Sequence, residues 1–77
     1  MRMISDIAKD IRRDWRQPYF GAVPYLEAMQ SLGTINDTYG YDSARSVVLY
    51  FLSNATGYRG EIARRCKAEL KQLLKGA

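Results

Sequence analysis

Histidine is absent from this 77-residue sequence, which removes the side chain that most often serves as a general base in enzymes. Carboxylates remain as acid–base candidates, and Asp6, Asp10 and Asp14 recur at four-residue intervals. On a helix this spacing places all three on one face, where they could in principle bind a divalent cation. Because hard cations prefer ligands that converge from several directions, we interpret the row as a solvated acidic stripe.

Cys66 is the single cysteine of the chain, which excludes an internal disulfide and a zinc site built from several cysteines. It falls on the apolar side of a predicted helix, where a free cysteine usually behaves as a small buried hydrophobe. The glycines are dispersed among expected helix ends and turns, and they form no phosphate-binding loop. We therefore expect a protein that is not an enzyme and that uses no metal or cofactor.

Helical periodicity runs through nearly the whole sequence, without strand-like alternation. It predicts an all-α protein, a compact bundle of about four short helices in a single domain over residues 1–77. The first helix is expected after Ser5, a good N-cap residue, and should stop before Pro18. The second is expected from Val23 to Leu32, with Gly33 as its C-terminal stop.

The turn-rich stretch that follows contains Ile35 and Tyr39, which predict one short helical turn before Gly40. A third helix is expected from Ser43 to Ala55, capped by Asp42 or Ser43. Because its residues 47–52 are all apolar, we expect it to lie at the centre of the domain. A buried strand is the alternative interpretation of that run, and the longer helical pattern around it favours a helix.

The fourth helix is expected from Gly60 to Leu74, with one apolar face. That face should be formed by Ile62, Ala63, Cys66, Leu70, Leu73 and Leu74.

The net charge of +4 favours acidic partners, and the basic residues are arranged in sectors. The first helix carries Lys9, Arg12, Arg13 and Arg16 on one side of the acidic stripe. Like charges four residues apart each cost an isolated helix roughly 0.2–0.5 kcal/mol. Such segregation indicates either an external partner or a solvated face with tertiary salt bridges, and both interpretations stay open.

The last helix carries a second basic stripe, and residues 43–75 have the general form of a helix-turn-helix with Gly57 in the connection. Exposed tyrosines beside arginines are also common at binding surfaces. The candidate partner-binding residues are Lys9, Arg12, Arg13, Arg16, Tyr58, Arg59, Arg64, Arg65, Lys67 and Lys71.

Three segments, "PYLEAM", "YDSARSVVLYFLSNA" and "RGEIARRCKAELK", resemble short proteins encoded by tailed bacteriophages and prophages. The resemblance implies an accessory protein in the host cell and transfers no residue roles. Our leading hypothesis is a non-enzymatic protein that binds a host or defence protein. The alternative is a small DNA-binding protein that uses residues 43–75 as a helix-turn-helix-like element.

The sequence contains no membrane-crossing run and no signal peptide, so we expect a cytoplasmic location in the host cell. A homodimer is a third hypothesis, because a core of this size often gains stability from oligomerisation.

Overall fold

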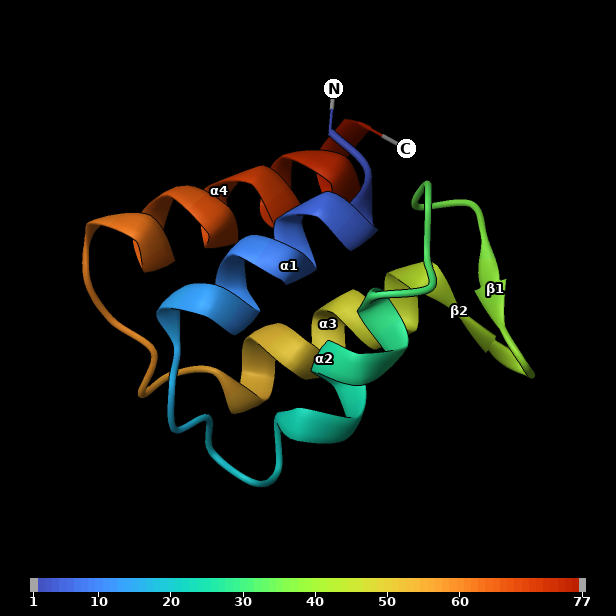
Figure 1. Ribbon diagram of the computed structural model, residues 1–77. Helices are drawn as coiled ribbons and strands as arrows, with labels where there is room; N and C mark the ends of the chain where they lie inside the picture. The colour runs from blue at the N-terminus through green and yellow to red at the C-terminus, as the bar shows by residue number, and fades with distance from the viewer. Residues whose placement is uncertain (1, 77) are drawn as a thin grey trace.

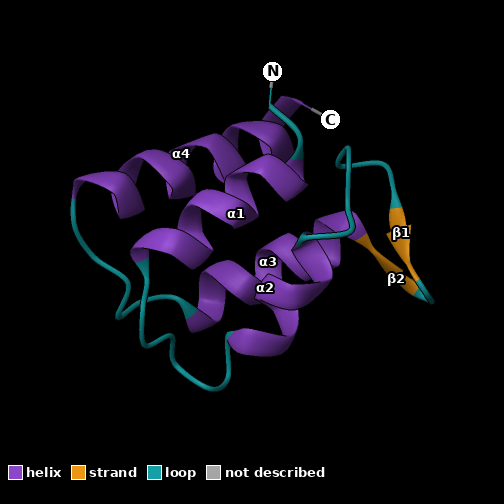
Figure 2. Ribbon diagram, in the orientation of Figure 1, coloured by secondary structure: helices purple, strands orange, loops and turns teal. Residues whose placement is uncertain are grey.

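The structure is a computed structural model that describes residues 2–76. Four helices and one small hairpin follow one another along these residues (Figures 1 and 2). The elements are α1 (Ile4–Asp14), α2 (Val23–Met29), β1 (Thr38–Tyr39), β2 (Asp42–Ser43), α3 (Ala44–Asn54) and α4 (Glu61–Gly76). The expected helical bundle is thus present, and the two-residue strands are an addition to it.

The helices pack around one shared core. α1 lies along α4 and also contacts α2, while α3 packs against α2 and α4, as Figure 1 shows. The largest fully buried side chains come from all four helices and from the segment after α2. They are Phe51, Ile4, Ile7, Ile11, Leu26, Met29, Leu32, Leu70, Val48 and Cys66.

Helix α1 begins at Ile4, so the expected start after Ser5 is wrong. The backbone amides of Ile4 and Ser5 donate to the carbonyls of Gly33 and Leu32, at 2.8 and 2.9 Å. These bonds satisfy amides that a helix otherwise leaves without partners at its start. A cap from the Ser5 side chain is therefore unnecessary, and the tertiary contact fixes where the helix begins.

Helix α2 ends at Met29, three residues before the expected end, although Leu32 is buried as expected. The amides of Gln30, Ser31 and Leu32 bond to carbonyls three residues back, so the chain tightens out of the α-helix. The Asp37 carboxylate then accepts from the Gly33 amide at 2.8 Å, which holds the following turn.

The predicted helical turn at residues 35–39 is wrong, because Tyr39 belongs to β1. Thr38 pairs with Ser43 and Tyr39 with Asp42 in an antiparallel hairpin. Gly40 has a φ of +63°, which suits a residue without a side chain in a tight turn. Two-residue strands are too short to show alternation, so the sequence carried no periodic signal for them.

Helix α3 begins after Ser43, whose hydroxyl accepts from the Ser46 amide at 3.1 Å, in agreement with the expected cap. The expectation that α3 lies at the centre is wrong: Leu49 is 49% exposed and Tyr50 is 54% exposed. Phe51 is fully buried. α3 packs against α2, α4 and β2, and its remaining side keeps a solvent face despite its apolar composition.

Of the expected apolar face of α4, Ala63, Cys66, Leu70 and Leu73 are buried, Leu74 is partly buried and Ile62 is 40% exposed. It continues to Gly76, two residues past the expected end. The Arg45 guanidinium of α3 donates to the Leu74 carbonyl at 3.0 Å, which supplies a partner near the C-terminal end of the helix.

Candidate functional site

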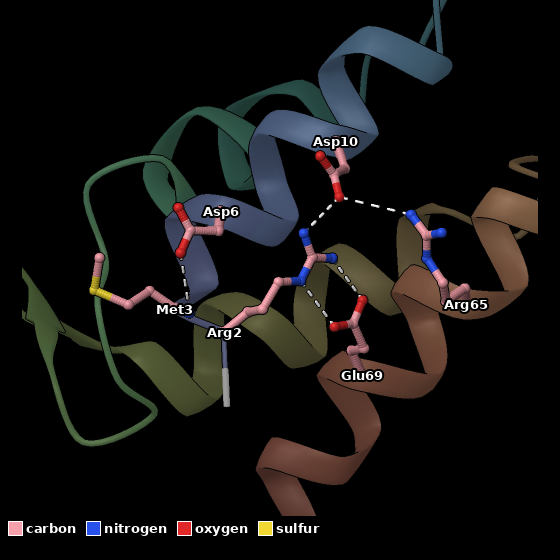
Figure 3. Close-up of polar contacts among 6 residues, drawn as sticks. All are labelled: Arg2, Met3, Asp6, Asp10, Arg65 and Glu69. Atoms are coloured by element: carbon pink, nitrogen blue, oxygen red, sulfur yellow. Dashed lines mark hydrogen bonds and ion pairs between the residues drawn. The ribbon is translucent and has the colours of Figure 1, made fainter.

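Asp10, the middle residue of the acidic stripe of α1, faces α4 and contacts basic residues of this same chain (Figure 3). Asp6 instead accepts from the Met3 amide, and Asp14 accepts from the Tyr58 hydroxyl. Arg2 donates from Nη1 to Asp10 at 2.6 Å, and from Nε and Nη2 to the two oxygens of Glu69 at 3.0 and 2.6 Å. Arg65 lies 3.7 Å from the same Asp10 oxygen. Arg2 thereby links the start of the chain to both α1 and α4.

Hydrogen bonds from Arg2 lower the pKa of the Asp10 carboxyl, with further lowering from the charges of Arg13 and Arg65. The pKa of Glu69 is lowered for the same leading reason. The charge of Asp10 is thus balanced within the molecule. Within residues 2–76 the cations of the basic sector of α1 form no ion pair, so both interpretations of that sector stay open. No metal-binding cluster of acidic or cysteine residues occurs within residues 2–76. The positive charge beside Asp10 is supplied by Arg2. The sequence did not indicate this contact, because Arg2 precedes the helix.

The basic sector of α1 is exposed to solvent at Lys9, Arg12, Arg13 and Arg16. Where this sector approaches α4, the Asp10 carboxylate feels the positive charges of both Arg13 and Arg65. Arg13 and Arg65 both border a hollow of about 320 Å³ between the helices. Its other lining residues are Asp10, Asp14 and Ile62.

Tyr58 is only 2% exposed, so its placement among the partner-binding residues is wrong. Its ring stacks on Trp15, with centroids 4.8 Å apart, and its hydroxyl donates to Asp14 at 2.8 Å. Burial, followed by this hydrogen bond, raises its pKa. Lys67 donates to the Tyr58 carbonyl at 2.6 Å, and its ammonium lies 5.7 Å from the centroid of the Tyr58 ring.

The side of α4 away from α1 carries a cluster that we call the basic flank, defined as Arg59, Arg64, Lys67 and Lys71. Within residues 2–76, none of these four forms an ion pair. Burial and then the positive charges of Lys71 and Arg59 lower the pKa of Lys67, so the cations lie close enough to repel one another. A hollow of about 310 Å³ opens beside the first turn of α4, lined by Tyr58, Arg59, Gly60, Ala63, Arg64 and Lys67.

The C-terminal end of α3 borders another hollow with a different lining, which we call the aromatic hollow. It measures about 440 Å³ and is lined by Tyr19, Ser53, Asn54, Thr56 and Gly57, none of which is charged. Tyr19 is 50% exposed and packs against Phe20, which is 80% exposed, with ring centroids 4.8 Å apart. One helical turn before Asn54, the exposed Tyr50 lies 5.5 Å from the ring of Tyr25.

The basic residues are concentrated in the two segments of the chain that contain α1 and α4. Eleven of the twelve basic residues lie in residues 2–16 and 59–75, which contain α1 and α4. Between residues 17 and 58 the only basic residue is Arg45, and this segment contains α2, α3 and the aromatic hollow. The sequence drew attention to the tyrosines near loops, but it gave no sign that Asn54 and Ser53 would meet Tyr19.

The helix-turn-helix interpretation predicts a short turn before the last helix. The connection between α3 and α4 covers residues 55–60, which is longer than the three or four residues typical of that motif.

Cys66 is buried in the core, and its burial raises the pKa of the thiol. A thiol in this state is a poor nucleophile, because the thiolate is the reactive form. None of the helices between residues 2 and 76 combines the length and apolar composition that a bilayer crossing requires.

Comparisons with protein-family models, with curated proteins and with solved structures found no match to this chain.

Proposed function

We propose that this protein is a non-enzymatic binding module that docks another protein at the aromatic hollow. The observation that carries the proposal is a hollow of about 440 Å³ whose lining is wholly uncharged and includes the exposed ring of Tyr19, on which the exposed ring of Phe20 packs. The central parts of protein interfaces are depleted in charged residues and enriched in aromatic ones. A side chain of the partner would fill the hollow, and the two rings would pack beside it.

The chemistry of the hollow supports binding rather than catalysis. It contains hydroxyl, amide and phenol groups, but no carboxylate, and Cys66 lies elsewhere in the core. The resemblance to short phage proteins favours a partner in the host cell and an accessory role. Exposed tyrosines supply large, rigid contact area with few rotatable bonds, which limits the entropy lost on binding.

The test uses two variants that alter the hollow and one that leaves it intact. Phe20→Ser removes the exposed ring that packs on Tyr19, and Gly57→Trp adds a ring at a residue that lines the hollow. The Cβ position of Gly57 has no neighbour within 4 Å, so the backbone accepts the larger side chain. Tyr41→Ala is the control, because Tyr41 is fully exposed at the tip of the hairpin, apart from the hollow.

Each tagged protein is used for affinity capture from host lysate, with bound proteins identified by mass spectrometry. We expect one partner to be recovered by the unaltered protein and by Tyr41→Ala, and to be lost with Phe20→Ser and Gly57→Trp. A partner retained equally by all four proteins would place the docking site elsewhere. Recovery of no specific protein would overturn the proposal.

A further inference from the structure

The basic flank of α4 is a second surface, and its chemistry differs from that of the aromatic hollow. Lys67 and Lys71 are one helical turn apart, about 6 Å along the axis, and Arg64 precedes them by a further turn. At about 100° per residue, all three project from the same side of the helix. Arg59 continues the flank just before the first turn.

The carboxylates of α4 lie outside the flank. Glu69 is turned towards α1, where Arg2 holds both of its oxygens (Figure 3). Glu61, three residues before Arg64, borders the flank at the start of the helix, and it forms no ion pair among residues 2–76. α3, the neighbour of α4 on the remaining side, carries no acidic residue.

The helix that carries the flank is fixed in the core. The opposite side of α4 is anchored in the core by Ala63, Cys66 and Leu70. Lys67 is fixed at the Tyr58 carbonyl, and Tyr58 itself is held by Trp15 and Asp14. The positions of these residues along the helix are therefore set before any partner binds, and one of the four cations, Lys67, is held in place.

We propose that the basic flank binds the phosphodiester backbone of a nucleic acid. Protein–protein interfaces are depleted in lysine and in charged residues at their centre, whereas nucleic-acid interfaces are strongly positive. A row of cations along one helix is complementary to a nucleic-acid strand, which carries one negative charge at the phosphate of each nucleotide. Arginine and lysine contacts of this kind position a protein on a backbone without reading its sequence.

This inference goes beyond the proposed protein-docking function and does not depend on it. It also does not require a helix-turn-helix, because backbone contacts need no helix inserted into the major groove. Four contacts predict a slope of about −3.6 for log Kobs against log salt on duplex DNA, and hence about 150-fold weaker binding when salt rises fourfold.

The experiment compares two triple variants that remove the same charges from different places. The test variant is Arg59→Gln, Arg64→Gln and Lys71→Gln, and the control is Lys9→Gln, Arg12→Gln and Arg16→Gln. Each removes two arginines and one lysine, all exposed and without ion pairs among residues 2–76. Lys67 is left in place because it bonds to the backbone of Tyr58.

Binding to a labelled duplex DNA and to a single strand of the same sequence is measured by fluorescence anisotropy across a salt series. For the duplex, we expect the test variant to have a slope near −1, and the control to keep the slope of the unaltered protein. Circular dichroism measures whether both variants keep the helical content of the unaltered protein. If the test variant is unfolded, the single variants Arg64→Gln and Lys71→Gln replace it, each with an expected slope change of about 1.

Equal losses in the two triple variants would overturn the inference, because binding would then follow net charge and not the flank. Poly-glutamate bound as tightly as DNA would overturn it in favour of an acidic polypeptide. No binding at about 50 mM salt would also overturn it, since that is a condition in which backbone contacts are strong. Phe20→Ser should leave DNA binding unchanged, because Phe20 lies outside the basic flank. The nucleic-acid proposal and the protein-docking proposal can therefore fail independently of each other.

Discussion

The indole of Trp15 lies stacked on the phenol ring of Tyr58, with ring centroids 4.8 Å apart and planes inclined by 17°. Trp15 follows α1 directly, and Tyr58 lies in the connection between α3 and α4. Phe51 meets the same indole edge-on at 6.3 Å. Aromatic contacts therefore join the end of α1 to α3 and to the connection that follows α3, which are distant from α1 in sequence.

Substituting Tyr58 should separate its packing role from its hydrogen bond. Tyr58→Ala should lower the free energy of unfolding by about 3–5 kcal/mol, the range for loss of a large buried ring. Tyr58→Phe keeps the stacking and loses the bond to Asp14, so it should cost about 1.5–3 kcal/mol. Urea denaturation measures both values. Equal costs for the two variants would contradict a packing contribution from the ring.

The two sides of α3 should respond differently to truncation. Phe51→Ala should cost about 3–5 kcal/mol, because the side chain is fully buried. Leu49→Ala, on the same helix and half exposed, should change stability by no more than about 0.5 kcal/mol. Thermal unfolding followed by circular dichroism compares the pair. A large loss with Leu49→Ala would mean that the outer face of α3 is covered in solution.

The Arg2 contacts should make folding sensitive to acid. Because the pKa values of Asp10 and Glu69 are lowered in the fold, their stabilisation is complete above the unfolded pKa values near 4. It is lost as pH falls through the folded values. Arg2→Gln should lower stability at pH 7 by about 1 kcal/mol and flatten this acid limb.

Melting temperatures between pH 7 and pH 2 test this expectation, with Arg12→Gln as the matched control. Arg12 is exposed and has no ion pair within residues 2–76, so its removal should leave the acid limb unchanged. An Arg2→Gln protein that loses stability with falling pH as steeply as the unaltered protein would contradict the role assigned to Arg2.

Cys66 should resist thiol reagents as long as the protein is folded. Its side chain is fully buried and its pKa is raised, so both access and the thiolate fraction are low. At pH 8 we expect an aromatic disulfide reagent to label native protein far more slowly than urea-unfolded protein. Rapid labelling of the native protein would contradict the burial of the α4 face that contains Cys66.

Local patterns predicted most of the helices but not how they share the core. The periodicity of Ile4, Ile7 and Ile11 was sufficient to identify the buried face of α1, because helix geometry repeats it. The run at residues 47–52 carried no such directional information, since an unbroken apolar segment marks no inward side. Which of these residues are exposed is determined only by the positions of α2 and α4.

Of the two candidate surfaces, the sequence predicted the basic flank but not the aromatic hollow. Arg64 and Lys71 were identified from charge and spacing alone, because both lie on one helix. The aromatic hollow could not be predicted, since it requires Tyr19 to reach Asn54 across more than thirty residues of chain. Tyr58 likewise stacks on a distant residue, Trp15, and its hydroxyl donates to Asp14. Contacts between remote segments leave no periodic trace in a sequence.

The turn at Gly40 and Tyr41 divides the protein into halves that hold each other together. α1 and α2 precede this turn and α3 and α4 follow it, yet α1 packs on α4 and α2 on α3. A protease cut at the fully exposed Tyr41 would therefore leave two fragments that remain associated through the core. The same position offers a natural break for a two-fragment complementation reporter, in which each fragment is completed only by the other.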